Sequence, residues 1–140
     1  MRVLYTAEAL ATGDGRNGHT RTTDGRIDLE LAVPKEMGGS GGGANPEQLF
    51  AAGYAACFHS ALRLVGSRAK ADVNDSAVGA KVGIGSTDNG GFGLTVVLEV
   101  TLPHLSEEEA QDLADKAHQV CPYSNATRGN IDVEVRVAQD

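Results

Sequence analysis

The chain has 140 residues, of which 41% are hydrophobic and 22% charged, a balance typical of a folded domain and not of a disordered segment. Its net charge of −7 argues against nucleic acid or an anionic membrane as a partner. The first residues lack the basic start and apolar core of a signal peptide, and the apolar run from Leu49 to Phe58 is too short to cross a bilayer. We therefore expect one soluble, cytoplasmic domain over residues 1–140.

Three short strands are predicted at the start of the chain. Apolar side chains alternate over residues 2–10, the glycine-rich run Gly13–Gly18 marks a turn, and residues 19–23 suit a second strand. Apolar side chains alternate again over residues 27–31, so we expect three antiparallel strands. The glycine-rich residues 34–44 predict a loop, either a mobile one over a site or a simple linker.

A long helix is predicted from Asn45 to about Lys70. Asn45 suits the N-cap, Pro46 the first helical position, and Gln48 the position where a capping box places Glu or Gln. Because every residue from Leu49 to Phe58 is apolar or glycine, the helix has no polar face there, which is typical of a helix at the centre of a protein. One small sheet covers only one side of such a helix, so we expect a second copy of the chain to cover the other side in a twofold dimer.

The second half of the chain predicts a hairpin, a helix and a last strand. Apolar residues alternate on both sides of a turn over residues 78–102. Ser106 opens a capping box for an amphipathic helix that ends near Cys121, because Pro122 limits its continuation. Alternation returns over residues 131–137. This order predicts an α+β fold with mainly antiparallel sheets around a central buried helix.

The two cysteines are the feature from which a function can be inferred. Buried cysteine is usually inert, but small neighbours leave room beside Cys57, and we expect a turn before Pro122 to expose Cys121. A second thiol is what a peroxidatic cycle needs, because it condenses with the sulfenic acid left after a thiolate attacks a peroxide. Apolar surroundings raise the pKa of a thiol, so the cycle also needs a cation, and an arginine held by a carboxylate suits that task.

Three stretches resemble the organic hydroperoxide resistance (Ohr) branch of the Ohr/OsmC family: Gly15–Gly18, Asn45–Phe58 and Cys121–Asn130. The resemblance runs along essentially the whole chain. It implies a thiol-dependent peroxidase without a bound cofactor that prefers organic hydroperoxides, including those of fatty acids, over hydrogen peroxide. It also implies an intertwined homodimer with sites at the subunit interface, reduced by a lipoyl-type dithiol on another protein. Residues available to line a pocket for an alkyl chain are Met37, Leu49, Phe50 and Phe58, although core packing is the simpler use of most of them.

The same resemblance implies a role for four residues. Cys57 matches the peroxidatic cysteine, Cys121 the resolving cysteine, Arg16 the catalytic arginine and Glu47 the acid that orients it. Each residue also has a plainer explanation: Cys57 and Cys121 as inert thiols, Arg16 as a solvated turn residue, and Glu47 as a first-turn acid favoured by the helix dipole. Glu47 and Cys57 are ten residues apart on one helix, which is about 15 Å along its axis. We therefore predict that Glu47, together with Arg16, reaches Cys57 from the partner subunit.

Three other functions stay open at this point. The OsmC branch of the family contains osmotically inducible peroxidases with the same fold and thiol pair. A tetrahedral metal site formed by Cys57, His59, His118 and Cys121 is a second alternative, although residues two apart on a helix point in different directions. The third is a redox sensor or interaction module that uses the same thiols, but the chain has no DNA-binding motif or basic patch.

Overall fold

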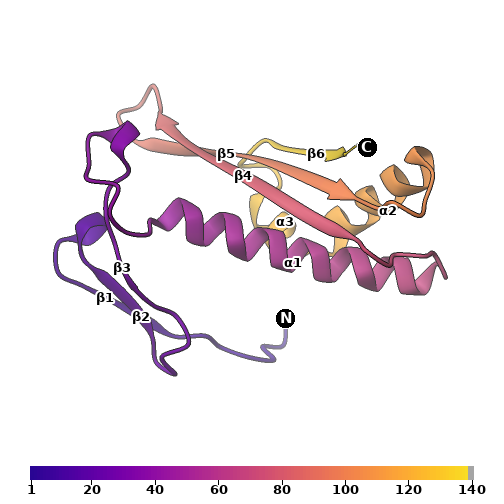
Figure 1. The fold of residues 1–140 in the computed structure, drawn as a ribbon, viewed down its shortest axis with the longest axis horizontal. Coiled ribbons are helices and arrows are strands. Elements are labelled where there is room, and N and C mark those ends of the chain that lie inside the picture. The colour runs from indigo at the N-terminus through magenta and orange to yellow at the C-terminus, as the bar shows by residue number, and fades with distance from the viewer. Residues whose placement is uncertain (139–140) are drawn as a thin grey trace. The chain divides into compact units, whose positions relative to one another are not determined.

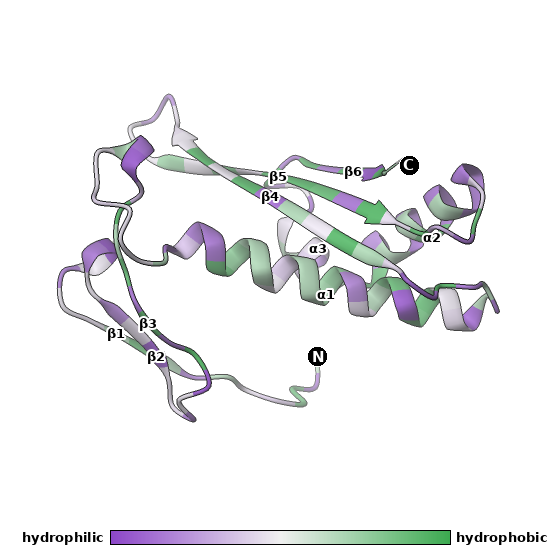
Figure 2. Cartoon of the chain, in the orientation of Figure 1, coloured by the Kyte–Doolittle hydropathy of each residue, from purple (hydrophilic) through white to green (hydrophobic). Residues whose placement is uncertain are grey.

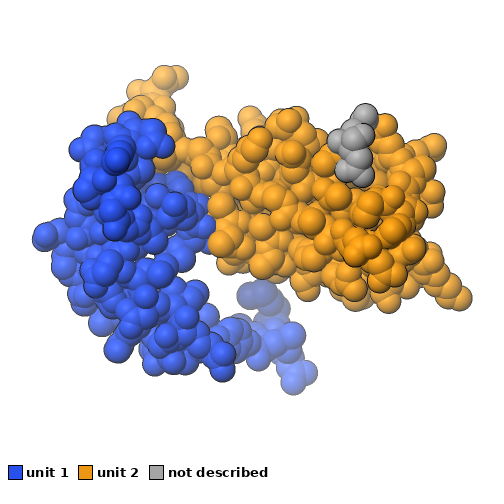
Figure 3. Space-filling view, viewed as in Figure 1, with its two compact units in different colours: residues 1–49 blue, residues 50–140 orange. Residues whose placement is uncertain are grey.

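The computed structural model describes residues 1–138 (Figure 1). Their internal contacts divide the chain into two compact units, Met1–Leu49 and Phe50–Asp140 (Figure 3). Helix α1 begins in the first unit and continues through the second. The elements in chain order are β1 (Ala9–Thr12), η1 (Gly15–Asn17), β2 (His19–Thr22), β3 (Asp28–Glu30), η2 (Lys35–Met37), α1 (Pro46–Arg68), β4 (Ala77–Ser86), β5 (Phe92–Thr101), α2 (Glu107–Val120), α3 (Pro122–Thr127) and β6 (Val133–Val137).

The first unit contains a small sheet in which β1, β2 and β3 are neighbours in that order. Both pairings are antiparallel, with Ala9 opposite Thr22 and His19 opposite Glu30. The predicted arrangement of three strands is confirmed, but β1 covers residues 9–12 and not residues 2–10. Residues 2–8 belong to no strand in the described part of the chain, and their large apolar side chains are exposed. Alternation alone therefore predicted a strand where nothing is available to pair with it.

The glycine-rich segment between β3 and α1 is held at both ends. The Ala32 N–H donates to the Ala44 carbonyl at 2.9 Å, and the Ala44 N–H donates to the Glu30 carbonyl at 3.0 Å. Inside the segment, η2 ends at Gly38, whose φ of +88° lies in the left-handed region that favours glycine. The predicted loop is thus closed at its base by backbone hydrogen bonds, and it delivers the chain directly to the start of α1.

Helix α1 starts as the sequence predicts. The Gln48 N–H donates to Asn45 Oδ1 at 2.9 Å and the Asn45 N–H donates to Gln48 Oε1 at 3.1 Å, which is a complete capping box. By length and composition alone α1 is apolar enough to span a bilayer, contrary to the expectation from its shorter apolar run. The core helix of a soluble protein meets the same criterion.

A mixed three-stranded sheet dominates the second unit. β4 and β5 form the predicted antiparallel hairpin, with Val82 opposite Val96, whereas β6 lies parallel to β5 with Leu98 opposite Val135. Parallel neighbours need a crossover connection, and α2 and α3 supply it. Figure 2 shows hydrophobic and hydrophilic residues mixed along these strands, which is typical of a sheet with one buried face.

The core of the second unit lies on that buried face. Along β5 the side chains of Val96, Leu98 and Val100 are buried, while their neighbours in sequence are partly or fully exposed. Because the strands bury one face only, the helices that complete the core all contribute to the same side of the sheet. Their buried residues are Tyr54, Phe58, Ala61, Leu62 and Val65 of α1 and Ala110, Leu113, Ala114 and Ala117 of α2.

Helix α1 is not buried all round within one chain. Ala52, Ala56 and Ser60, spaced four residues apart on one face, are exposed, and Leu64 is 43% exposed. This exposed stripe agrees with the expectation that one sheet leaves a side of the helix uncovered. The second copy of the chain that we expect to cover it stays a prediction.

Helix α2 begins at its predicted N-cap, because the Glu109 N–H donates to Ser106 Oγ at 3.2 Å. The Glu109 carboxylate accepts from the Ser106 hydroxyl at 2.9 Å, and not from its backbone N–H as in a full capping box. The end of α2 differs from the prediction. Pro122 does not lead into an open turn but occupies the first turn of α3, where its missing N–H leaves no bond unmade. Cys121 is therefore the junction of two helices and is fully buried, so the prediction that a turn exposes it is wrong.

Candidate active site

Two free thiols lie next to each other in the second unit. Cys121 Sγ is 3.4 Å from Cys57 Sγ and donates a hydrogen bond to it. A disulfide needs a separation of about 2.05 Å, so the two sulfur atoms have to approach each other by only about 1.35 Å to form a bond. The structure thus brings together two cysteines that are 64 residues apart in the sequence.

The two thiols differ in exposure. Cys57 is half-buried, whereas Cys121 is 0% exposed. This reverses the expectation from the sequence, which placed Cys57 in a dry core and Cys121 at the surface. The cause is local. One face of α1 beside Cys57 is left uncovered, while α3 folds back immediately after Cys121 and covers it.

The surroundings of Cys57 disfavour its thiolate. Burial raises the pKa of the Cys57 thiol above its ordinary value, a hydrogen bond from the Tyr123 backbone N–H lowers it, and neighbouring Cys121 raises it again. The net effect is a raised pKa. An attacking thiolate at Cys57 therefore needs a positive charge beyond these neighbours.

The first unit holds a guanidinium and a carboxylate as a pair. Arg16 lies in η1, between β1 and β2, and Glu47 lies in the first turn of α1. Arg16 Nη1 donates to Glu47 Oε1 at 2.6 Å and Nη2 donates to Oε2 at 3.2 Å, so the contact is bidentate. The hydrogen bond to Glu47 raises the pKa of Arg16 further above its ordinary value, and the guanidinium stays charged. Thus the structure pairs Arg16 with Glu47 in one unit and Cys57 with Cys121 in the other.

An apolar hollow of about 350 Å³ opens in the second unit, lined by Phe50, Tyr123, Ala126, Thr127 and Ile131. Phe50 is the only one of the four predicted pocket residues that lines it. Phe58 is fully buried in the core and Met37 is 42% exposed. The hollow adjoins the thiols through Tyr123, whose backbone N–H donates to Cys57.

Three aromatic rings pack together beside the thiols. The ring centroids of Phe50, Tyr54 and Tyr123 are 5.6 to 6.1 Å apart, in tilted or edge-on arrangements. Gly53 permits this packing, because a Cβ atom there would lie 3.0 Å from Tyr123 Oη. The absence of a side chain at Gly53 therefore lets Tyr123 lie close against α1.

A buried polar cluster joins α1, α2 and α3, and it was not predicted from the sequence. Tyr54 Oη is 2.8 Å from Ser124 Oγ and 3.2 Å from Thr127 Oγ1, and His118 Nδ1 is 2.7 Å from Ser124 Oγ. The spacing of Ser124 and Thr127, which puts both on one face of a helix, would have indicated it only if α3 had been predicted.

The alternative of a tetrahedral metal site at Cys57, His59, His118 and Cys121 finds no support among the described residues. His118 Nδ1 contacts Ser124, and His59 Nε2 contacts Ser76 Oγ at 2.8 Å. Over residues 1–138, no group of three or more His, Cys, Asp or Glu side chains is arranged to hold a metal ion. The two imidazoles serve as hydrogen-bond partners of serines in different places.

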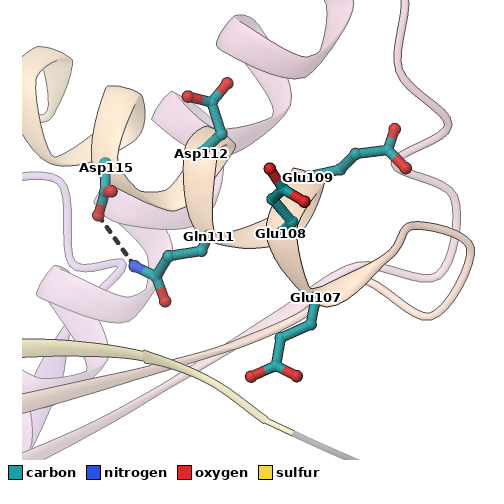
Figure 4. A pocket seen from close by; sticks show the side chains of 6 residues that line it. All are labelled: Glu107, Glu108, Glu109, Gln111, Asp112 and Asp115. Carbon is teal, nitrogen blue, oxygen red and sulfur yellow. Dashed lines mark hydrogen bonds between the residues drawn. The ribbon is translucent and has the colours of Figure 1, made fainter.

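A hollow of about 820 Å³ along α2 is not a second reaction site. It is lined by Glu107, Glu108, Glu109, Gln111, Asp112 and Asp115 of α2. Figure 4 shows these side chains pointing in different directions, and the one hydrogen bond drawn joins Gln111 to Asp115 at 2.9 Å. Acidic residues in the first turn of a helix are favoured by its dipole, which accounts for Glu107, Glu108 and Glu109. Asp112 pairs with Lys116 at 2.9 Å, and Asp115 accepts from Gln111.

The fold and the site define an α+β protein with a free thiol pair at the meeting point of three helices, and comparison with known proteins agrees. Residues 39–136 match the family model described as OsmC-like protein. The chain is 52% identical over 139 residues to the organic hydroperoxide resistance protein of Xanthomonas axonopodis pv. citri, covering 98% of this chain and 96% of that protein.

Solved structures give the same result. An organic hydroperoxide resistance protein from Elizabethkingia anophelis superposes with a TM-score of 0.94 at 56% identity, covering 100% of both chains. The organic hydroperoxide resistance protein OhrB of Bacillus subtilis superposes with a TM-score of 0.88 at 42% identity, covering 97% of this chain and 100% of that one. The chain therefore belongs to the OsmC-like family, in its organic hydroperoxide resistance branch.

Proposed function

We propose that this protein is a cysteine-based peroxidase that reduces organic hydroperoxides to alcohols and so contributes to resistance against them. The observation that carries the proposal is the 3.4 Å separation of Cys57 Sγ and Cys121 Sγ. The names of the relatives, which refer to organic hydroperoxide resistance, support the same substrate class.

In the first step, the Cys57 thiolate attacks the terminal oxygen of the hydroperoxide ROOH. An S–O bond forms and the O–O bond breaks, so that Cys57 becomes a sulfenic acid. The RO⁻ leaving group takes up one proton and departs as the alcohol ROH. Cys57 suits this role better than Cys121 because it is half-buried, whereas Cys121 is 0% exposed.

In the second step, the Cys121 sulfur attacks the sulfenic sulfur of Cys57. A disulfide forms, and the sulfenic oxygen leaves as water with the proton of the Cys121 thiol. An external dithiol then reduces the disulfide by exchange, and its own two sulfurs become a cyclic disulfide. A lipoyl-type dithiol, carried by another protein, fits this step because its two thiols are already linked.

The Arg16–Glu47 pair supplies the positive charge that the Cys57 thiolate needs. Burial raises the pKa of Cys57, and at about 4 Å an arginine offsets this by roughly 4 kcal/mol at an effective dielectric constant near 20. Glu47 holds the guanidinium through two hydrogen bonds, which fixes where its charge is presented. In this proposal Arg16 and Glu47 act on Cys57 of the partner subunit in a homodimer.

The apolar hollow beside Tyr123 is the proposed location for the alkyl group of the substrate. Its lining is mainly aromatic and aliphatic, and it adjoins Cys57 through Tyr123. An alkyl or fatty-acyl chain gains free energy by leaving water for such a surface, whereas hydrogen peroxide has nothing to place there. We also propose that the enzyme works in the cytoplasm, where reduced dithiols regenerate it.

A steady-state assay tests the proposal. Purified protein is given cumene hydroperoxide or hydrogen peroxide, with dihydrolipoamide or a monothiol as the reductant. We expect the highest kcat/KM for cumene hydroperoxide with dihydrolipoamide, and no turnover by Cys57→Ser. Equal or better use of hydrogen peroxide, or turnover that survives Cys57→Ser, would contradict the proposal.

A further inference from the structure

Four hydrogen bonds form a continuous series from His118 through Ser124, Tyr54 and Thr127 and back to the Ser124 carbonyl. His118 Nδ1 lies 2.7 Å from Ser124 Oγ, which lies 2.8 Å from Tyr54 Oη, which lies 3.2 Å from Thr127 Oγ1. Thr127 Oγ1 donates to the Ser124 carbonyl at 3.1 Å. Tyr54, Ser124 and Thr127 are each at most 3% exposed, so water is not a ready substitute for any partner in this chain.

The number of hydrogens fixes the direction of these hydrogen bonds. The series of hydrogen bonds has four contacts but only three hydroxyl groups, those of Tyr54, Ser124 and Thr127, and each hydroxyl donates one hydrogen. Thr127 uses its hydrogen on the Ser124 carbonyl, so Tyr54 donates to Thr127 and Ser124 donates to Tyr54. The hydrogen between His118 and Ser124 must then come from His118 Nδ1. Only the Nδ1–H form of His118 satisfies all four contacts.

This series of hydrogen bonds joins the helices that carry the two sulfur atoms. Tyr54 precedes Cys57 by one helical turn on α1, His118 precedes Cys121 in the last turn of α2, and Ser124 lies in α3. Helix α3 has six residues, and a helix of that length depends on packing and not on its own hydrogen bonds. The placement of Cys121 relative to Cys57 therefore depends on what holds α3.

Arg128 makes two further hydrogen bonds between the end of α2 and α3. Arg128 Nη2 donates to the His118 carbonyl at 2.5 Å and Nη1 donates to Asn125 Oδ1 at 2.8 Å. Burial and the charge of Arg128 lower the pKa of His118, so its imidazole is neutral at neutral pH. His118 thus donates from Nδ1 without carrying a charge.

We propose that His118, in its Nδ1–H form, is a positioning residue that orients the resolving thiol: its hydrogen bond to Ser124 ties α2 to α3 and Tyr54 and so keeps Cys121 within reach of Cys57. The role of His118 in the peroxide cycle rests on the proposed function. The hydrogen-bond chain itself does not depend on that function.

The tautomer is tested on the wild-type protein. The ¹⁵N chemical shifts of the His118 imidazole, assigned by comparison with His118→Asn, distinguish Nδ1–H from Nε2–H directly. We expect the Nδ1–H form at neutral pH. The Nε2–H form would overturn the inference, because the Ser124 hydroxyl would then have to donate to His118.

The positioning role is tested by the equilibrium between the Cys57–Cys121 disulfide and glutathione, which gives the effective concentration of one thiol at the other. His118→Asn places an amide N–H near the Nδ1 position, whereas His118→Gln places it near the Nε2 position. We expect the Gln variant to lower the effective concentration about tenfold, as for one lost buried hydrogen bond, and the Asn variant to stay near wild type. An equal change in both variants, or none in either, would overturn the proposal.

Ser124→Ala serves as a second test and also covers poor folding of the Gln variant. If His118 acts through Ser124, Ser124→Ala lowers the effective concentration, and adding His118→Gln to it gives no further loss. Additive losses would show that His118 acts by another route. The glutathione equilibrium needs no peroxide, so a protein with a strong disulfide and no peroxidase turnover would refute the proposed function while leaving the positioning role intact.

Discussion

The carboxylate of Glu47 accepts hydrogen bonds from both terminal nitrogens of Arg16, at 2.6 and 3.2 Å, although the two residues are 31 positions apart in the chain. A fork of this kind fixes the plane of the guanidinium as well as its position. Since the two side chains are 37% and 14% exposed, the pair adds at most about 1 kcal/mol to folding. Its geometry is therefore better explained by directing a charge than by stabilising the fold.

Replacement of Arg16 tests that explanation. Arg16→Ala is expected to raise the pKa of Cys57 and to slow its oxidation by cumene hydroperoxide at least about tenfold, the effect of one pKa unit. Arg16→Lys keeps a charge but loses the fork, so we expect an intermediate rate. The pKa is read from thiolate absorbance and the rate from stopped-flow. Unchanged values in Arg16→Ala would rule out the assigned role.

A mixing experiment decides which subunit supplies the arginine. Arg16→Ala chains alone are expected to be at least about tenfold slower than wild type and Cys57→Ser chains inactive, but a mixed dimer has one complete site if Arg16 acts across the interface. Random pairing of equal amounts makes half of the dimers mixed, so about a quarter of wild-type activity should return. No recovery after subunit exchange would indicate that Arg16 serves Cys57 of its own chain.

Removal of the buried thiol separates the two halves of the cycle. Cys121→Ser is expected to keep the first oxidation of Cys57 at least as fast as in the wild type, because Cys121 raises the pKa of Cys57 and its removal does not disfavour the thiolate. The sulfenic acid then has no partner and is oxidised further to sulfinic acid. Mass spectrometry after one and after ten equivalents of hydroperoxide should show this sequence. A variant that still turns over at the wild-type rate with dithiol would contradict a resolving role.

Gly53→Ala probes the close approach of Tyr123 to α1. The added Cβ lies 3.0 Å from Tyr123 Oη, and Tyr123 is 40% exposed, so its ring has room to shift. Alanine favours a helix by about 1 kcal/mol over glycine. We expect unchanged or higher stability in urea but slower disulfide formation, because Tyr123 moves beside the thiols.

Gly66→Ala in the same helix is the matched control. There the new Cβ lies 2.5 Å from Val73 Cγ1, and Gly66 is buried. Overpacking costs about 1–3 kcal/mol, which outweighs the gain in helix propensity. This variant should therefore lose stability without a specific effect on the thiols. The reverse pattern in the two variants would refute the steric argument.

The pH dependence of stability follows from His118. Its pKa is lowered by burial and by Arg128, so below its ordinary value of about 6.5 the unfolded chain binds a proton that the folded chain does not. Stability therefore falls as the pH drops from about 7 towards 5. Urea unfolding of His118→Asn should show a flatter curve over that range. His104 acts in the opposite direction, because its hydrogen bond with Asp75 raises its pKa, so His104→Gln should steepen the curve.

Local signals in the sequence predicted most of the elements correctly. The capping box at Asn45 forms as expected, Ser106 is the N-cap of α2, and the hairpin of β4 and β5 matches the alternation. These features depend on residues close together in the chain, so a single sequence contains the information. The family resemblance is confirmed as well.

The errors come from contacts between distant segments. Residues 2–8 alternate like a strand but have none to pair with in the described chain, and Pro122 starts α3 where it was expected only to end α2. The burial of Cys121 follows from α3, so missing that helix reversed the expected exposure of the two thiols. The chain through His118 joins three helices, and no periodicity in one segment reports it.

The difference in burial between the two sulfur atoms makes the two ends of the proposed disulfide unequally accessible. A reductant arriving from solution meets the half-buried sulfur of Cys57 before the covered one of Cys121. In the proposed cycle we predict that the transient mixed disulfide forms at Cys57 and that Cys121 departs as the leaving group into the protein interior. Regeneration in this proposed cycle would then be regioselective: the sulfur proposed to be oxidised first is also the one that accepts the incoming thiol.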